Sequence, residues 1–333
     1  MRLLCFVTVA VLAAPCFAVG RAEATPLPGI NLSAAAFASG RIPGRDNWDY
    51  MFPRENEVEY FSSQGMRLIR LPVLWERVQP QLLSDLDPGY LAHIQAVAAI
   101  AKARKAKVII DLHNYGAYGG NLIGSDAVSV EAFVDVWVRL ARVFGADRNV
   151  LFGLMNEPKI ASAQDWAAIQ QKVINAVRAA GAKNIIAVSG VNWDGAHNFP
   201  QVNGDALATL TDPHHALIFE AHQYFDGDSS GRSAECVPQD QVERRLSPFA
   251  DWLKAHHAKG LLGEFGVSSN AGCLADLEAA LNFIHQTSGV WYGWTYWAGG
   301  PLWGNYIYSV EPGKDGSEKP QMSVLKQAVE RSH

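Results

Sequence analysis

Two glutamates lie near the ends of apolar runs, where a carboxylate can do chemistry. Glu157 follows the run FGLMN (residues 152–156), and Glu264 lies in GLLGEF (residues 260–265). A pair of carboxylates can hydrolyse a glycosidic bond, because one donates a proton to the departing oxygen while the other attacks the anomeric carbon or activates water there. Taken alone, Glu157 would be a solvated residue before a turn and Glu264 half of a buried ion pair. The choice depends on what surrounds them.

Further polar and aromatic side chains stand at the ends of similar runs. They are Arg70, His113, Asn156, His222, Tyr224 and Trp297. Amide and imidazole groups can hydrogen-bond sugar hydroxyls, and flat aromatic faces can pack against the apolar C–H faces of sugar rings. Two histidines could also suggest a metal, but no third ligand accompanies His113 and His222 at a supporting spacing. We therefore expect no metal site.

The elements that must position these residues alternate along the chain. The apolar or β-branched runs that we interpret as strands are residues 29–32, 67–73, 107–113, 150–155, 184–189, 216–222, 260–265 and 290–297. Stretches with apolar residues at helical spacing include residues 90–104, 130–144, 165–180, 241–256 and 274–287. Asp165 is placed to cap its helix, and Gly145, Gly181 and Gly289 stand where helices should end.

Eight strand–helix units predict an α/β protein built as a single (β/α)8 TIM barrel. Strands that are apolar without alternation favour a parallel sheet covered on its outer face. The alternative is an open doubly wound sheet, but the first strand is not followed by a dinucleotide-binding glycine loop. In such a barrel, active sites form at the C-terminal ends of the strands, so the polar residues above are expected to converge on one cleft.

Composition narrows the setting of this barrel. The 333 residues are 49% hydrophobic and carry a formal charge of -5, which disfavours nucleic acid and anionic membranes as partners. Residues 1–24 have the layout of a secretory signal peptide, with cleavage after Ala24 or, alternatively, Ala18. We expect residues 25–333 to form the catalytic barrel, without a membrane anchor, in a secreted or periplasmic monomer.

Removal of the signal leaves two cysteines, Cys236 and Cys273. An even pair in an exported protein predicts one disulfide, and two separate buried thiols are the alternative.

The ordered motifs resemble glycoside hydrolase family 5, in the clan of retaining barrels whose two glutamates follow strands four and seven. The matching segments are RLP (70–72), DLHNY (111–115), MNEP (155–158), AHQYFD (221–226) and GEFG (263–266). The resemblance covers nearly all of the chain after the signal. It implies that Glu157 is the acid/base and Glu264 the nucleophile, with no metal or cofactor.

The run from His222 to Cys236, together with the GEFG segment and Cys273, is similar to the endoglucanase subfamily that includes secreted fungal cellulases. This similarity implies endo-cleavage of β-1,4-glucan and supports the Cys236–Cys273 bridge. Activity on mannan, xyloglucan or another β-glucan would use the same catalytic set. A barrel that binds glucan without cleaving it is a further alternative, which the presence of both glutamates disfavours.

The remaining residues have expected roles around this pair. Arg70 and Tyr224 would keep Glu264 ionised, and Asn156 would bond the sugar 2-hydroxyl. His113 and His222 would orient sugar and carboxylate, and Trp297 would be the sugar platform at the cleavage site. Trp193 and Trp303 either extend the cleft or pack loops, and Asp111 supports its strand end.

Overall fold

The computed structural model describes residues 25–331. The predicted signal peptide, residues 1–24, lies outside the described residues. Within the described part of the chain, no helix is both long and apolar enough to cross a membrane.

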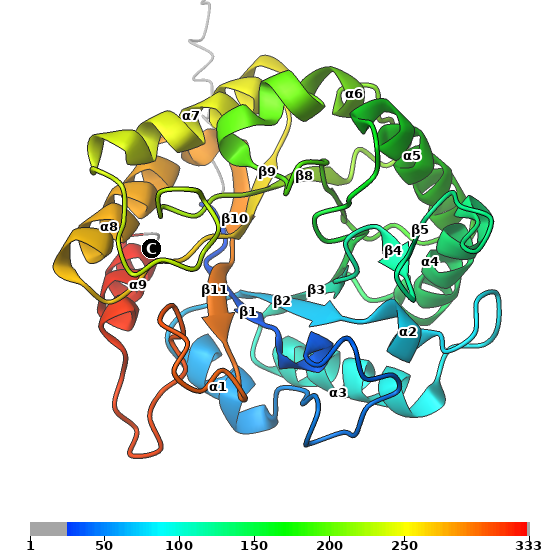
Figure 1. Cartoon of the computed structure of the whole chain (residues 1–333), viewed down its shortest axis with the longest axis horizontal. Helices are drawn as coiled ribbons and strands as arrows, with labels where there is room; N and C mark the ends of the chain where they lie inside the picture. The colour runs from blue at the N-terminus through cyan, green and yellow to red at the C-terminus, as the bar shows by residue number, and fades with distance from the viewer. Residues whose placement is uncertain (1–24, 332–333) are drawn as a thin grey trace, which may run out of the picture.

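Nine parallel strands form one sheet that curls into a barrel with helices around it (Figure 1). The strands are β1 (Gly29–Leu32), β2 (Leu68–Val73), β3 (Lys107–Leu112), β6 (Val150–Gly153), β7 (Ile186–Val188), β8 (Leu217–His222), β9 (Gly260–Glu264), β10 (Trp291–Trp294) and β11 (Tyr296–Gly299). Around the barrel they follow the order β10-β9-β8-β7-β6-β3-β2-β1-β11. A short hairpin, β4 (Ala117–Tyr118) and β5 (Asn121–Leu122), follows β3. The predicted barrel is confirmed.

The eighth barrel strand differs from the prediction, because it is interrupted at Thr295. The Thr295 hydroxyl donates a hydrogen bond to the Gly263 carbonyl at 2.6 Å, and the strand divides there into β10, which pairs with β9, and β11, which pairs with β1. Leu27 links the two edges: its N–H donates to the Tyr292 carbonyl, and its carbonyl accepts from Trp294 N–H, both at 3.0 Å. These bonds close the barrel.

The barrel interior is apolar toward the N-terminal ends of the strands and polar toward their C-terminal ends. The apolar part is a compact cluster of buried residues, namely Leu68, Ile109, Leu151, Ala187, Ile218 and Leu261. Side chains two residues apart on a strand share a face, so the next inward positions on β2, β3 and β8 belong to Arg70, Asp111 and Glu220. All three are buried. The sequence thus places a layer of charged side chains next to the apolar cluster, closer to the C-terminal ends of the strands.

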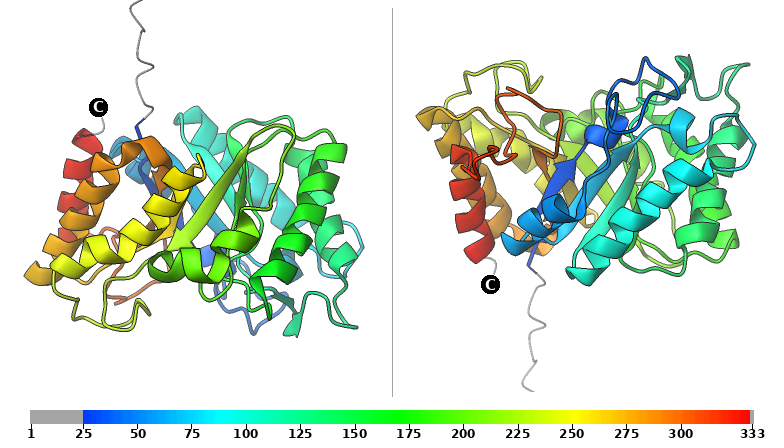
Figure 2. Two further views of the ribbon diagram at one scale, coloured as in Figure 1. Left: turned by 90° about the horizontal axis from the view of Figure 1, so that it is seen from above. Right: turned by 90° about the horizontal axis from the view of Figure 1, so that it is seen from below.

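The outward strand residues pack beneath a ring of helices (Figure 2). The long helices are α1 (Glu55–Ser63), α3 (Pro88–Ala103), α4 (Val130–Phe144), α5 (Ala163–Ala179), α7 (Asp240–Ala255), α8 (Ala271–Gln286) and α9 (Pro320–Glu330). The shorter turns are α2 (Trp75–Val78), α6 (Asp205–Leu207), η1 (Ala34–Ala36), η2 (Ala196–Asn198), η3 (Pro200–Gly204) and η4 (Ser288–Val290).

Three helix-level expectations need correction. Ser162, rather than Asp165, caps α5, because its hydroxyl accepts a hydrogen bond from Asp165 N–H at 3.1 Å. Gly289 lies inside η4, whereas α8 already ends at Gln286. β7 is followed only by short helical turns, whereas eight strand–helix units would place a full helix there.

Candidate active site

Arg70 lies at the centre of the buried charged layer. Its guanidinium donates hydrogen bonds to Glu264 Oε1 at 2.8 Å and Asn156 Oδ1 at 2.7 Å, and its Nε forms an ion pair with Glu220 Oε1 at 2.9 Å. Burial alone would lower the pKa of Arg70, but the carboxylates around it, with Asp111 foremost, raise it overall. Arg70 therefore stays cationic and offsets the negative charge gathered at the strand ends.

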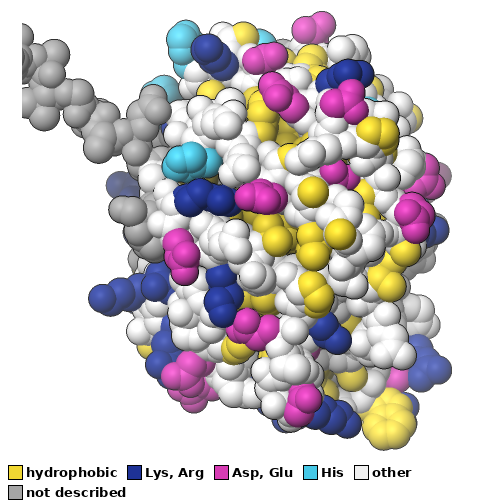
Figure 3. Space-filling view, turned by 90° about the vertical axis from the view of Figure 1, so that its left-hand side faces the viewer, with side chains coloured by type: hydrophobic (Ala, Val, Ile, Leu, Met, Phe, Trp, Pro, Cys, Tyr) yellow, Lys and Arg dark blue, Asp and Glu magenta, His cyan; other side chains and the backbone are white. Residues whose placement is uncertain are grey.

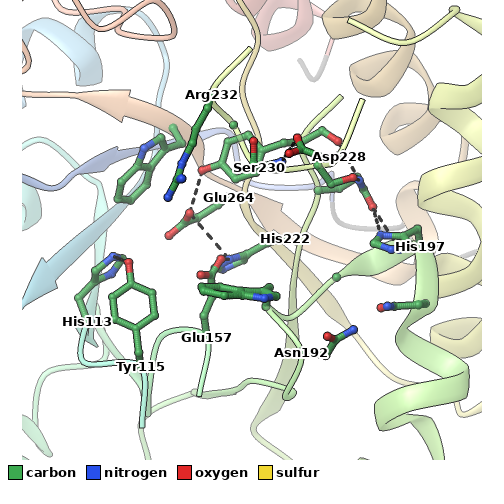
Figure 4. Close-up of a pocket in the computed structure, with 18 of the residues that line it drawn as sticks. His113, Tyr115, Glu157, Asn192, His197, His222, Asp228, Ser230, Arg232 and Glu264 are labelled. Atoms are coloured by element: carbon green, nitrogen blue, oxygen red, sulfur yellow. Dashed lines mark hydrogen bonds and ion pairs between the residues drawn. The ribbon is translucent and has the colours of Figure 1, made fainter. Parts of the chain in front are cut away.

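Glu157 and Glu264 face one another with His222 beside them (Figure 4). His222 Nδ1 lies 2.7 Å from Glu157 Oε1 and 3.8 Å from Glu264 Oε2. One oxygen of each carboxylate lies within 4.8 Å of the other. Tyr224 OH donates a hydrogen bond to Glu264 Oε2 at 2.8 Å. Both oxygens of Glu264 are therefore held, by Arg70 and Tyr224 as expected, whereas Glu157 is hydrogen-bonded through one oxygen.

Three carboxylates hold His222 as a cation. Burial alone would lower its pKa, but Glu264, Glu157 and Glu220 together raise it well above its usual value. Protonated at both nitrogens, the ring donates from Nδ1 to Glu157 and from Nε2 to Glu220 Oε1 at 3.2 Å. His222 thus connects Glu157 to a second, deeper carboxylate.

That deeper carboxylate, Glu220, was not predicted from the sequence. It lies on β8 two residues before His222 and is 2% exposed. Burial alone would raise its pKa, but Arg70 and His222 lower it overall, so Glu220 remains ionised. Gly263 on the neighbouring strand β9 leaves room for it, since a Cβ at that position would overlap Glu220 Oε1. Alternate residues of a strand face the same side, so the position of Glu220 two residues before His222 was the signal in the sequence that could have identified it.

Asn156 and Glu157 are held in an unusual local geometry at the end of β6. Asn156 is buried, and its Nδ2 has no hydrogen-bond partner among the described residues, although its Oδ1 accepts from Arg70. Glu157 has a φ of 40°, in the left-handed region that non-glycine residues seldom adopt. Such strain persists where the surroundings fix it, and it is common at functional sites. A free buried amide donor beside a constrained carboxylate suits recognition of a hydroxyl.

His113 and Trp297 form one wall of the site. Their rings are stacked, with centroids 5.6 Å apart and planes inclined by 13°. His113 Nδ1 lies 2.9 Å from Asp111 Oδ2, and the same oxygen lies 3.3 Å from the Arg70 guanidinium. Asp111 therefore does more than support its strand end, because it also orients His113.

The carboxylate pair opens into a cavity of about 600 Å³ with aromatic walls. Trp193 and Trp303 both line it, together with Trp297 and Tyr306. Trp193 is 56% exposed, and Trp303 is stacked on Tyr306 with centroids 4.5 Å apart. Of the two interpretations of Trp193 and Trp303, the structure favours extension of the cleft.

A loop after β8, residues 226–236, forms another wall of the cavity. The Asp226 carboxylate accepts hydrogen bonds from the backbone N–H groups of Gly231, Arg232 and Ser233, at 3.2, 3.0 and 3.2 Å. The end of the loop is tied to α8 by the Cys236–Cys273 disulfide, which the sequence predicted. Arg232 lines the same cavity as Glu264 (Figure 4) and was missed by sequence reasoning, because nothing in the loop marks the direction of its side chain.

The two histidines do not act as a ligand pair. His113 contacts Asp111, whereas His222 forms, with Glu157 and Glu264, the group of possible metal donors whose atoms converge within the described part of the chain. Each of those three side chains is already engaged by a hydrogen bond to a neighbouring side chain.

Known proteins with similar sequences are endoglucanases. Residues 27–300 match the model of cellulase (glycosyl hydrolase family 5). Endoglucanase gh5-1 of Neurospora crassa is 36% identical over 286 residues, which cover 85% of this chain and 72% of that protein. Endo-beta-1,4-glucanase B of Aspergillus niger is 35% identical over 285 residues, which cover 85% of this chain and 84% of that protein.

Solved structures of similar proteins have the same barrel. XacCel5A in complex with cellopentaose has a TM-score of 0.90 and 44% identity, over 91% of this chain and 99% of that one. Endoglucanase Cel5A of Pseudomonas stutzeri, in complex with cellobiose, has a TM-score of 0.85 and 34% identity, over 92% of this chain and 95% of that one. The resemblance seen in the motifs is confirmed: the chain belongs to glycosyl hydrolase family 5.

Proposed function

We propose that this chain is a secreted endo-β-1,4-glucanase that cleaves with retention through a covalent glycosyl-enzyme at Glu264. The observation that carries the proposal is the pair Glu157 and Glu264, whose carboxylate oxygens lie within 4.8 Å inside an aromatic cleft. Retaining enzymes have carboxyl groups about 5 to 5.5 Å apart, whereas inverting enzymes separate them by about 6.5 to 9.5 Å. The names of the similar proteins support β-1,4-glucan as the substrate.

In the first half-reaction, Glu264 attacks the anomeric carbon as the glycosidic C–O bond breaks. Arg70 and Tyr224 fix the two oxygens of Glu264 by hydrogen bonds, while the departing oxygen takes the proton of Glu157. The buried cation of His222 beside Glu157 positions its carboxyl group for that transfer. Asn156 Nδ2, which has no partner among the described residues, donates to the sugar 2-hydroxyl.

In the second half-reaction, water replaces the departed chain. Glu157 takes a proton from the water, whose oxygen attacks the anomeric carbon and releases Glu264 as a carboxylate. The anomeric configuration is inverted twice and therefore retained. Trp297 serves as the platform for the reacting sugar, and Trp193 and Trp303 as platforms for its neighbours.

Secretion agrees with the signal-like residues 1–24 and with the disulfide, since disulfides persist in oxidising compartments. We propose that the protein acts as a monomer, outside the cell or in a periplasm.

The test is sugar release from soluble cellulose by the wild type, Glu157→Gln and Glu264→Gln, with Asp251→Asn on the exposed surface of α7 as control. We expect Glu157→Gln to lose about 10²- to 10⁴-fold in kcat, the contribution of one acid or base, and Glu264→Gln to lose at least as much, because it removes the nucleophile of the covalent route. On an aryl cellobioside, whose leaving group departs without a proton, azide should restore turnover of Glu157→Gln by attacking the glycosyl-enzyme in place of water and forming a glycosyl azide, but it should not restore Glu264→Gln.

Two further measurements separate the alternatives. NMR of the first product from a cello-oligosaccharide should show the β-anomer, and an α-anomer would exclude Glu264 as nucleophile. A panel of soluble cellulose, mixed-linkage glucan, xyloglucan and mannan tests the substrate, and hydrolysis of mannan alone would overturn the assignment to glucan. Binding of glucan without sugar release would make the chain a non-catalytic barrel.

A further inference from the structure

Three successive residues in the turn after β7 have left-handed backbone conformations. Asn192, Trp193 and Asp194 have φ values of 60°, 59° and 54°. Residues with a Cβ seldom adopt this region, and they usually do so singly. Asn192 (Figure 4) and Trp193 line the catalytic cavity, and 56% of the Trp193 surface is exposed. The strained segment is therefore the one that presents this indole to the cleft.

Two buried side chains hold the turn, residues 190–194, in this shape. Asp194 Oδ1 accepts a hydrogen bond from Gly190 N–H at 2.6 Å, which closes the turn on its first residue. Asn203, from η3, binds both polar groups of the Val191 backbone: its Oδ1 accepts from the N–H at 2.9 Å, and its Nδ2 donates to the carbonyl at 3.1 Å. Asp194 and Asn203 are both 0% exposed. Strained backbone persists where such surroundings fix it.

The same turn is tied to the neighbouring strand β8. The Asp194 carbonyl accepts a hydrogen bond from His222 N–H at 2.7 Å, next to a parallel bridge between Gly195 and His222. A change at Asp194 therefore has two routes to the cleft, one through the Trp193 ring and one through His222.

The Asp194 carboxyl group is not used in the reaction steps above. Its Oδ2 has no hydrogen-bond partner among the described residues. Burial raises the pKa of Asp194 well above its ordinary value; His222 opposes the rise, whereas Glu220 and Glu157 add to it. Asp194 is thus a neutral carboxylic acid, and it adds no charge beside the catalytic residues. Its contribution is the hydrogen bond that closes the turn.

Trp193 lies on the Glu157 side of the cleft. The ammonium group of Lys159, two residues after Glu157, lies 4.7 Å from the centre of the indole, and the ring of Tyr115 lies 6.3 Å away. Since Glu157 gives its proton to the departing chain, this indole faces the sugars of the leaving half.

We propose that Asp194 is a positioning residue: together with Asn203, it fixes the left-handed turn that holds Trp193 against the leaving half of the glucan. The inference rests on the function proposed above. Asp194 acts through Trp193, because its carboxyl group closes the turn that contains the indole. The bond to His222 comes from the backbone, which any residue at position 194 supplies.

The test compares two substrates in a double-mutant cycle. Cellopentaose has leaving sugars that can reach Trp193, whereas β-cellobiosyl fluoride loses a single atom. For Asp194→Ala we expect kcat/KM to fall about tenfold on cellopentaose, as for the loss of roughly 50 Å² of apolar contact, and to change little on the fluoride. Trp193→Ala should behave alike. Asp194→Ala/Trp193→Ala should lose no more than Trp193→Ala, because the two residues act through one contact.

Asp194→Asn is the conservative variant. Its amide oxygen can accept the same bond from Gly190 N–H, and one neutral group replaces another. We expect it to keep most of the activity on cellopentaose and the pH profile of the wild type. A shifted limb of that profile would mean that an ionised Asp194 acts on Glu157 or His222, contrary to the proposal.

Asp212→Ala is the matched control, since Asp212 is also a buried carboxylate that accepts from backbone N–H groups, those of His214 and Ala216, but it does not line the cleft. It should lower the unfolding midpoint and leave the ratio of kcat/KM between the two substrates unchanged. Equal losses on both substrates in Asp194→Ala would indicate the route through His222 and overturn the proposal. Additive losses in the double variant would do the same.

Two variants disturb the turn without touching Asp194, and they decide the matter if Asp194→Ala does not fold. Asn203→Ala removes the clamp on Val191. Gly190→Ala displaces it, because a Cβ at position 190 would lie 2.4 Å from the Asn203 amide. Both should lose activity on cellopentaose and keep it on the fluoride, and unchanged activity on cellopentaose would contradict the proposal.

Binding without catalysis separates this inference from the proposed function. Glu264→Gln, Glu264→Gln/Asp194→Ala and Glu264→Gln/Asp194→Asn would be run through gels containing hydroxyethylcellulose, and only the variant with alanine should be retarded less. If the wild type binds glucan but cleaves none, the proposed function fails while this comparison still tests the turn. Equal retardation of all three, or none in any, contradicts the role of Asp194.

Discussion

Glu220 acts on the two cations of the active site, Arg70 and His222, without lining the cleft itself. Its hydrogen bond to His222 is one of the interactions with three carboxylates that raise the pKa of that histidine. A group with a raised pKa in the folded state stabilises the fold at low pH, and this stabilisation is lost as the pH rises through the folded pKa. Removing the charge of Glu220 lowers the pKa of His222, so this stabilisation of the fold is lost at a lower pH.

Glu220→Gln should therefore change the pH profile of activity. We expect the alkaline limb of kcat/KM to move down by about one pH unit or more, because an opposite charge at hydrogen-bond distance typically shifts a pKa by that amount. Asp212→Asn is the matched control, since it breaks a buried ion pair with Arg178 (2.7 Å) that does not line the cleft. Asp212→Asn should lower the stability of the fold and leave the alkaline limb of kcat/KM in place. If the alkaline limb does not move in Glu220→Gln either, the role given to Glu220 is contradicted.

Among individual residues, the sequence identifies those at the C-terminal ends of strands but not those that lie one layer deeper inside the barrel. Glu157 and Glu264 stand out because each follows or ends an apolar run. Glu220 lies inside a predicted strand, and only the alternation of faces could have placed it beside His222. Which atoms meet depends on the stagger of neighbouring strands around the barrel, which the order of residues along one strand does not specify.

The loop of residues 226–236, which the Cys236–Cys273 disulfide ties to α8, is the element through which stability and activity are coupled. Cys236 and Cys273 are 37 residues apart, and a bridge closing a loop of that size is expected to contribute about 3 to 4 kcal/mol. The loop of residues 226–236 also places Ser229 to Arg232 in the wall of the catalytic cavity. Loosening it should affect the cleft as well as the fold.

Cys236→Ser/Cys273→Ser should lower the free energy of unfolding by about 3 to 4 kcal/mol in urea titrations, and kcat/KM should fall with it. Reduction of the wild type with dithiothreitol should reproduce both changes, while leaving the double variant as it was. Equal unfolding midpoints for oxidised and reduced wild type would show that the bridge does not stabilise the folded chain.

Among the elements, all eight predicted strands are present, and the differences are the division of the eighth into β10 and β11 and the short hairpin of β4 and β5. The interruption at Thr295 arises from a side-chain hydrogen bond to the neighbouring strand, which is invisible in a continuous apolar run. The connection between η1 and α1, which contains Trp48, has no periodic pattern, so nothing in the sequence singles out that tryptophan. The hollow that Trp48 lines exists only in the assembled barrel.

For the molecule as a whole, surface charge is mixed. The face shown in Figure 3 intersperses acidic and basic side chains with small apolar groups, in keeping with the formal net charge of -5. Stability is influenced more by charges below the surface. Asp276 on α8 is 1% exposed, and its Oδ2 has no hydrogen-bond partner among the described residues.

Burial raises the pKa of Asp276 to about 6, above its ordinary value, while Arg245 opposes the shift. The folded protein therefore holds more protons than the unfolded chain between about pH 4 and pH 6, so the Asp276 contribution to stability falls as the pH rises through that range. Asp276→Asn should flatten this part of the curve of unfolding free energy against pH. The exposed Asp251→Asn should not, and identical slopes for wild type and Asp276→Asn would refute the assignment.

Closure of the barrel also has a consequence for the order in which the chain folds. Asn31 Nδ2 reaches the Tyr296 carbonyl across a separation of 265 residues, and β1 takes β11 as its neighbour. Contacts between such distant segments form late, because a long loop must close first. In an exported chain the N-terminal strand emerges first, and one of its edges stays unpaired until the last strand has followed. The barrel therefore cannot complete its fold before the last strand is available, and a chaperone that shields β1 would be of most use during that interval.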